Sequence, residues 1–276
     1  MTVEPDADQL RPELAAILAA GRRTRLRRGF FVLLGLAVVA YVLYLADVLN
    51  LPRYRDAYRT ITTLIGDALP PDFSRWRSWG KPLEETLAMS AAGTAIACVL
   101  ALPLSIVAAR NIGTPWLSRI VRVLLNTARS IPDVIWGIAW VAAVGFGPLP
   151  GALALTCHST GVLGEFYAQI LEHVEPAPGD ALRSQGVSWL GVFRFATLSQ
   201  VLPRFVDVSL YRWEHNVRSA IVLGVIGAGG IGLQIVTAFN LFYYREASAL
   251  IMVLLALVMV INFTAARIRA RFLSPT

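Results

Sequence analysis

Charge is scarce in this sequence. Only 16% of its 276 residues are Asp, Glu, Lys or Arg, whereas about a quarter are charged in an ordinary soluble domain. Hydrophobic residues make up 56% of the chain, and its mean hydropathy is +0.59. The charges gather near the two termini and in short segments between long apolar runs. This composition excludes a chain solvated by water alone and favours one that lies largely in lipid.

Lysine and cysteine are also rare. Lys81 is the single lysine, so arginine carries nearly all of the positive charge. A net charge of +7 would suit nucleic acid, but the arginines flank apolar runs instead of sharing a basic face with aromatic residues, so we predict no nucleic-acid partner. Cys98 and Cys157 both lie inside apolar runs, which predicts small buried residues and neither a disulfide nor a paired metal site.

No phosphate-binding motif of the form G-x-x-x-x-G-K-S/T is present, so energy from ATP would have to come from another chain. The histidines, His158, His173 and His215, and the carboxylates are scattered. Because no cluster of acid, base and nucleophile forms at one membrane face, we predict no catalytic residue, no cofactor and no metal on this chain. A membrane-embedded enzyme and a non-catalytic scaffold remain alternatives to transport.

The apolar runs predict an all-α membrane protein with about six transmembrane helices. The first span, 30–49, is too long for a signal peptide and lacks a small-residue cleavage site. The segment 50–82 is expected to be an external loop or to lie at the membrane interface. Further spans are expected at about 83–109, 131–146, 149–170, after Pro203 and at about 247–266.

Arginines next to these runs predict the orientation of the chain. RRTRLRR lies in the N-terminal segment, 1–29, and RIRARF begins the tail, 267–276, so both termini are expected in the cytoplasm. The arginines of the 50–82 segment run against this rule. The N-terminal cluster is denser, however, and the first helix usually sets the orientation.

The stretch VLGVIGAGGIGLQIV contains Gly227, Gly229 and Gly232 in the G-x-G-x-x-G spacing of dinucleotide-binding loops. Such a loop needs a βαβ unit, with an acidic residue at the end of its second strand. Here the next long apolar stretch has the length of a membrane span. We therefore favour helix packing or bending as the purpose of the glycines: Gly224, Gly227, Gly229, Gly230 and Gly232.

The polar segment EPAPGDALRSQGVSWLGVFRFATLSQVLPRF is expected on the cytoplasmic side. Asp180 is predicted to cap a short helix and Gly186 to end it. A second amphipathic segment, 189–198, follows. Two short amphipathic helices between spans need a partner surface or lipid head groups to lie against.

This segment resembles the coupling loop of ABC-importer permeases, on the residues Asp180-Ala181-Leu182, Gly186 and Leu202-Pro203. Aspartate stands where glutamate is usual, and leucine where alanine is commonest. The stretches RSIPDVIWGIAWVAAVGFGPLPGALAL, HSTGVLGEFYAQILEHVEPAPGDALRSQG, LPRFVDVSLYRWEHNVRSA and VLGVIGAGGIG resemble the phosphonate/phosphate-type branch. The resemblance implies an ABC type I importer permease fold with an additional N-terminal span, and a permease core at 83–266 with a coupling loop at 172–203.

The same resemblance implies a subunit of the bacterial cytoplasmic (inner) membrane that forms a path for phosphonate, phosphate or a related oxyanion. Its partners would be a second permease, identical or paralogous, two ATPase subunits that hold ATP and Mg, and an extracytoplasmic binding protein, besides membrane lipid. Another small solute remains an alternative. The residues expected to contact the ATPase are Gly179, Asp180, Ala181, Leu182, Gly186, Leu202 and Pro203.

Polar residues inside or beside the spans are unfavourable in lipid unless they face protein or water. Arginines and hydroxyl groups would suit a transient path for an oxyanion. Alternatively, Arg129 and Arg218 extend to the interface or pair with Glu214 or Asp133, and His158 serves helix packing. The candidates for the path or its gate are Arg129, Ser130, Pro132, His158, Ser159, Arg218 and Ser219.

Overall fold

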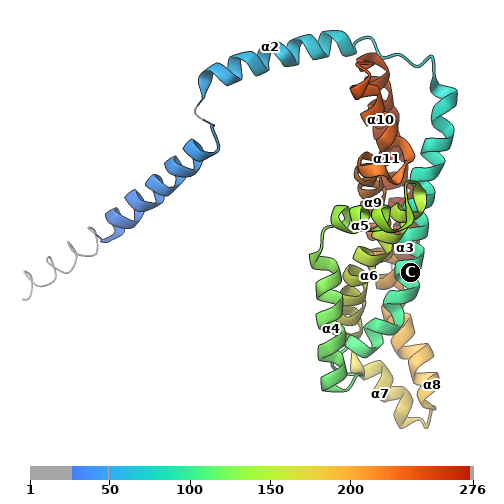
Figure 1. Cartoon of the computed structure of the whole chain (residues 1–276). Helices are drawn as coiled ribbons and strands as arrows, with labels where there is room; N and C mark the ends of the chain where they lie inside the picture. The colour runs from blue at the N-terminus through green and yellow to red at the C-terminus, as the bar shows by residue number, and fades with distance from the viewer. Residues whose placement is uncertain (1–26, 49, 274–276) are drawn as a thin grey trace, which may run out of the picture. The chain divides into compact units, whose positions relative to one another are not determined.

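The computed structural model describes residues 27–48 and 50–273, and the regular structure in these ranges is helical (Figure 1). The chain forms two units, one that ends at Ile65 and one that begins at Gly66. Most of the N-terminal segment 1–29, Leu49 at the end of the first expected span and residues 274–276 of the tail lie outside the described residues. The all-α architecture expected from the sequence is confirmed.

The first unit contains an apolar helix, Arg27–Leu45, and most of α2 (Leu51–Ala68). Arg27–Leu45 has 19 residues and buries none of its apolar side chains, so it needs lipid or another protein around it. The segment expected as a loop or interfacial segment begins with the helix α2. Its exposed apolar stripe follows helical spacing, as in a helix that lies at a membrane interface: Tyr54, Tyr58, Ile61 and Ile65.

The centre of the second unit is formed by α3 (Gly80–Ala108), α6 (Pro148–Glu172) and α9 (Leu198–Leu223), which pack against one another. Small residues let α3 and α6 approach closely. A Cβ atom on Gly93 of α3 would lie 2.7 Å from the Cβ atom of Leu155 on α6. A larger residue at Gly93 would therefore force these two helices apart.

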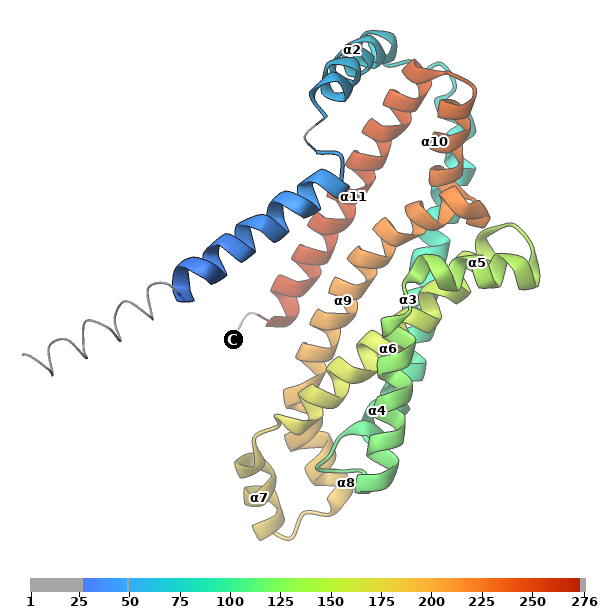
Figure 2. The same ribbon diagram turned by 60° about the vertical axis from the view of Figure 1, so that its left-hand side comes forward.

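The third expected span, 131–146, corresponds to α5 (Asp133–Val144), and another helix, α4 (Pro115–Ser130), precedes it. The chain breaks between them at Ile131 and Pro132, because proline cannot continue the hydrogen bonds of the preceding turn. Figure 2 shows the two helices running in different directions from this break. Both pack against α6.

Two short helices, α7 (Pro176–Ser184) and α8 (Trp189–Val192), connect α6 to α9 at the end of the bundle opposite α10 (Figures 1 and 2). A π-helical segment, Phe193–Thr197, joins α8 to α9. The connection expected at 172–203 is therefore shorter, because Leu202 and Pro203 lie inside α9. Pro203 lies in the second turn, where its missing N–H removes one hydrogen bond while the helix continues.

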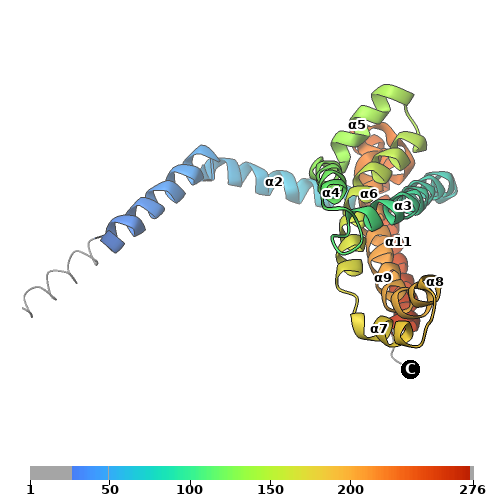
Figure 3. The ribbon, with the colours of Figure 1, turned by 90° about the horizontal axis from the view of Figure 1, so that it is seen from below.

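After α9 the chain bends by 58° into α10 (Gly230–Asn240) and returns as α11 (Tyr244–Leu273). α11 packs along α9 (Figure 3), and in the view of Figure 2 it lies on the side of α9 away from α4. A 3-10 turn, η1 (Trp76–Trp79), precedes α3. Its Trp79 is buried against α10 and α11, and this contact joins the start of α3 to both helices.

Three helices of the described residues are long and apolar enough to cross a membrane: Arg27–Leu45, Trp76–Ala108 and Tyr244–Arg271. The bent pair α9–α10 provides a fourth. The other two of the expected spans are α5, which has 12 residues, and α6, whose 25 residues extend for about 37 Å but include several small polar residues. Thr156 and Ser159 are two such residues of α6, and both find hydrogen-bond partners within the protein.

Candidate functional site

The α7 segment, which was expected to contact an ATPase, forms a short helix. Pro176 takes its first position, after Glu175, because the fixed φ of proline suits a helix start. The prediction that Asp180 caps this helix is wrong, since Asp180 lies inside it and pairs with Arg183 at 3.0 Å on the surface. Gly186 follows the helix with a positive φ of 76°, as expected for a residue that ends it.

The α7–α8 hairpin has a buried side, where its two helices meet, and an exposed side. Gly179 is buried, and a Cβ atom there would lie 3.5 Å from Val192, so α7 packs directly on α8. Asp180, Ala181 and Gly186 are exposed. Trp189 and Leu190 are 73% and 66% exposed, although they are large and apolar. Large apolar side chains that are exposed on a helical hairpin are typical of a surface that contacts a partner.

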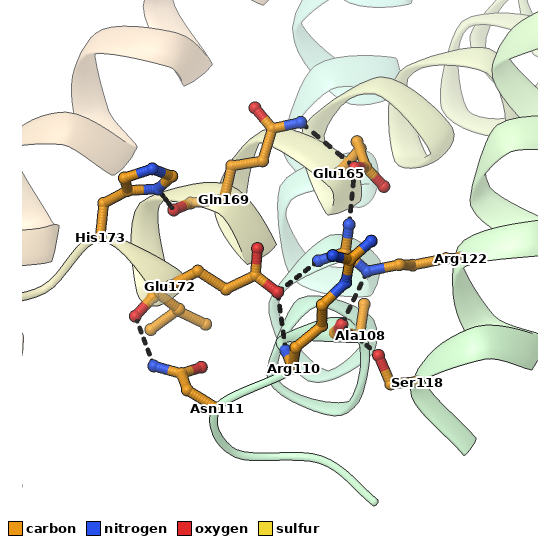
Figure 4. Close-up of polar contacts among 10 residues, drawn as sticks. Ala108, Arg110, Asn111, Ser118, Arg122, Glu165, Gln169, Glu172 and His173 are labelled. Atoms are coloured by element: carbon orange, nitrogen blue, oxygen red, sulfur yellow. Dashed lines mark hydrogen bonds and ion pairs between the residues drawn. The ribbon is translucent and has the colours of Figure 1, made fainter. Parts of the chain in front are cut away.

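A buried ion-pair cluster, formed by Arg122, Glu165 and Glu172, lies beside this hairpin (Figure 4). The Arg122 guanidinium of α4 contacts Glu165 at 3.0 Å and Glu172 at 2.6 Å, both on α6. Its Nε also donates to the Ala108 carbonyl at the end of α3. Glu172 accepts a further hydrogen bond from the backbone N–H of Arg110. Three helices are thus joined by one arginine.

This cluster connects the end of α6, close to the start of α7, with α4. α6 ends at Glu172, and α7 starts at Pro176 after a short connection. Through Arg122 the end of α6 is fastened to α4, which leads to the break at Pro132. None of these three residues was predicted from the sequence. A signal was present, because Arg122 and Glu165 are charged residues within helices that pack in a membrane protein.

A second polar network lies halfway along the bundle and joins α3, α6 and α9. Asn216 of α9 donates to Thr94 at 2.8 Å and to Ser159 at 2.9 Å. Arg212, one turn earlier on α9, donates to Ser159 through Nε at 2.8 Å. All four side chains are buried. Ser159 was expected from the sequence, whereas Thr94, Arg212 and Asn216 were not.

The histidines of this region lie next to the network. His158 contacts the Ile131 carbonyl, at the break before α5, through Nδ1 at 2.9 Å. His215 lies 3.4 Å from Ser219 on the next turn of α9. Of the expected residues, Ser159 therefore contacts Arg212, His158 precedes Ser159 on α6 and contacts the break next to Pro132, and Ser219 lies beside His215 on α9.

The remaining expected path residues lie elsewhere. Arg129, Ser130 and Arg218 are exposed on the isolated chain. Among the described residues neither arginine lies within ion-pair distance of a carboxylate, so the alternative of pairing with Glu214 or Asp133 is wrong. Glu214 instead pairs with Arg269 of α11 at 2.6 Å. Their role in a path stays a prediction.

The five glycines expected to serve packing or bending all lie at the bend between α9 and α10. Gly227 and Gly229 have positive φ angles of 106° and 80°, which a side chain would strain. A Cβ atom on Gly224 would lie 2.5 Å from the Gly229 carbonyl oxygen, and one on Gly232 would clash with the Ile221 carbonyl. Gly230 follows directly and begins α10.

Two side chains of α3 cap this start of α10. The backbone N–H of Gly230 donates to Glu85 at 3.0 Å, and that of Ile231 donates to Thr86 at 2.9 Å. The carboxylate and hydroxyl thus fill the place that a phosphate would take at a dinucleotide loop. A helix, and not a strand, precedes these glycines. The dinucleotide alternative therefore finds no support in the described residues.

Apolar spans, a bent span and an exposed helical hairpin define the class of this chain as a multi-pass helical membrane protein. Within the described residues no group of three or more His, Cys, Asp or Glu could hold a metal ion. The chain belongs to the family of binding-protein-dependent transport system inner membrane components, whose model matches residues 101–274. This confirms the resemblance to importer permeases and places the chain among multi-pass proteins of the inner membrane.

Two curated relatives are similar over much of the chain. The phosphite transport system permease protein of Stutzerimonas stutzeri is 43% identical over 265 residues, which cover 92% of this chain and 96% of that protein. The phosphate-import permease protein of Mycolicibacterium smegmatis is 33% identical over 222 residues, covering 80% of this chain and 42% of that protein.

The fold is similar to that of solved importers. An inward-facing form of the MetNI methionine ABC transporter matches with a TM-score of 0.60 and 22% sequence identity, over 70% of this chain and 95% of that chain. At this sequence identity the similarity is evidence for the fold alone. The fold is that of a type I importer permease, as expected.

Proposed function

We propose that this chain forms the translocation path of an ATP-driven importer for phosphite, phosphate, a phosphonate or a related phosphorus oxyanion. The observation that carries the substrate class is the 43% identity to a phosphite transport permease across nearly the full length of both chains. A buried arginine in the middle of the bundle, Arg212, is compatible with an anionic solute.

We further propose that the chain acts with partners. A second permease, identical or paralogous, would complete the path, and an extracytoplasmic binding protein would deliver the ligand. Two ATPase subunits, which hold ATP and Mg, would bind the α7–α8 hairpins. The exposed Trp189 and Leu190 support this assignment, because ATPase contact would bury them.

In this scheme closure of the ATPase dimer moves the two α7–α8 hairpins together. The movement passes from α7 to α6 and, through Arg122, to α4. Hydrolysis on the ATPase chains reverses it, so this subunit performs no chemistry itself. Both termini lie in the cytoplasm, which places α7 and α8 on the same side as the ATPase.

The test is uptake by the assembled importer. The chain is produced with its binding protein and ATPase, reconstituted into liposomes, and supplied with labelled phosphite, phosphate or methylphosphonate. ATP-dependent accumulation of one of these, abolished without the binding protein, is the expected result. Accumulation of a chemically unrelated solute, with none of the phosphorus oxyanions carried, would overturn the substrate assignment.

A further inference from the structure

Arg212 differs from the partly buried arginines Arg122 and Arg269 in its lack of a counter-charge. It is 5% exposed and lies halfway along α9. Arg122 and Arg269 are each held by two carboxylates. Among the described residues no carboxylate lies within ion-pair distance of Arg212, although the charge of Asp133 acts on it from farther away.

Part of the Arg212 guanidinium is also without a hydrogen bond. Nε donates to Ser159, but the buried Nη2 has no partner among the described residues. A buried charge with an unmet donor is unfavourable by several kcal/mol unless a ligand or water supplies the acceptor. Water would satisfy the donor and leave the charge, whereas an anion satisfies both.

Helix packing alone does not explain why an arginine is present. Asn216 already joins α3, α6 and α9 through Thr94 and Ser159, with three hydrogen bonds among buried side chains. Ser159, which is itself held by Asn216, accepts from Nε of the guanidinium. The guanidinium is thereby oriented while Nη2 keeps a free donor, and a planar fork with a free donor can bind an oxyanion.

We propose that the free edge of Arg212 is the mid-membrane contact for the transported oxyanion, with Ser159 and Asn216 as positioning residues. This inference rests on the proposed function and adds the site at which that solute is held in transit. The ligand is a tetrahedral oxyanion with two oxygen atoms that accept from one guanidinium. A single unpaired cation suits transport, because a site with several would release the anion slowly.

The experiment compares three variants in the complete importer, reconstituted with its binding protein and ATPase. Arg212→Gln keeps a donor for Ser159 and loses the charge, and Arg212→Lys keeps the charge. Arg204→Gln, which removes an exposed arginine of the same helix, is the control. At saturating ligand-loaded binding protein we expect Arg212→Gln to lower the uptake rate of phosphite or phosphate by about tenfold or more, with stimulated ATP hydrolysis retained.

A purely structural arginine gives a different order of rates. If Arg212 only donates to Ser159, the glutamine variant transports as well as or better than the lysine variant, and the inference is overturned. Uptake in the order wild type, lysine, glutamine supports an anion contact. If Arg212→Gln does not assemble, the wild-type complex is melted with about 10 mM sodium phosphite or with sodium chloride of equal ionic strength. The binding protein is left out of this melt, because it would bind phosphite itself; a rise in the melting temperature of the permease–ATPase complex with phosphite alone supports the site, and no rise overturns it.

The results separate this inference from the proposed function. Phosphorus oxyanion uptake that is unchanged in Arg212→Gln overturns the site and leaves the function standing. If the wild type carries sulfate or another oxyanion but no phosphorus compound, and Arg212→Gln loses that uptake, the substrate assignment fails and the site stands. Uptake of a neutral or cationic solute alone overturns both.

Discussion

The guanidinium of Arg122 lies 2.6 Å from the carboxylate of Glu172 and fastens α4 to the end of α6. The two side chains are 15% and 19% exposed, so the pair is largely shielded from water. Removal of one partner would leave the other charge buried without compensation. The contact between α4 and α6 is therefore sensitive to substitution.

Arg122→Ala is expected to destabilise the chain by about 3–5 kcal/mol, because two buried carboxylates lose their counter-charge. Since α4 would no longer follow α6, ATP hydrolysis by any importer that assembles should rise relative to uptake. Thermal melting and the ratio of ATP hydrolysed to solute carried measure the two effects. Arg119→Ala removes an exposed arginine of the same helix and should change neither quantity. Equal behaviour of the two variants would show that the ion-pair cluster has no mechanical role.

The close contact at the bend between α9 and α10 predicts the effect of one methyl group. Gly232→Ala would place a Cβ atom against the Ile221 carbonyl, which is backbone and cannot turn away. We expect a loss of assembled complex or of transport, and a fall of at least 1–3 kcal/mol in stability, as is typical of overpacking. Gly80→Ala is the control, because no atom lies within 4 Å of a Cβ atom there. Wild-type yield, stability and uptake in Gly232→Ala would refute the close-approach interpretation.

Asn216 provides a test of the buried network that does not touch a charge. Asn216→Leu removes the amide that pairs with Thr94 and Ser159, so two buried hydroxyl groups lose a partner. A loss of about 1–3 kcal/mol in the free energy of unfolding is expected. Chemical denaturation in detergent measures it, with Asn50→Leu, at an exposed site, as the comparison. A change below a few tenths of a kcal/mol would mean that water replaces the amide.

Much of the helical order could be predicted from the sequence, because each element carries its own signal. The apolar run expected at about 83–109 is α3, and the one at 149–170 is α6, to within a few residues. The span expected at 131–146 is α5, and Pro132 separates it from α4, since the lack of an N–H is a local property. The glycines of the 224–232 stretch lie at a bend for the same kind of local reason.

The partners of polar side chains could not be predicted, because they lie far apart in the sequence. Glu85 and Thr86 cap α10 from 145 residues away, and Arg122 finds Glu172 across 50 residues. The start of α7 was misplaced because Pro176 and Asp180 both signal a helix start, and the proline at the first position prevailed. The burial of Arg212 and its missing partner could not be predicted either, because both depend on how α6 packs against α9.

The exposed apolar tip of the α7–α8 hairpin predicts where an ATPase binds. Leu190→Ser should leave the stability of the isolated chain unchanged, because Leu190 is 66% exposed and its removal opens no cavity. Burial of a leucine at an interface contributes about 1.5–3 kcal/mol, so copurification of the ATPase should fall by roughly tenfold or more. Trp76→Ala, at the other end of the bundle and 62% exposed, is the control for loss of an exposed apolar side chain. If the leucine variant retains the ATPase as well as wild type, and Trp76→Ala does not, the ATPase contacts a different surface, and the α7–α8 hairpin is no coupling element.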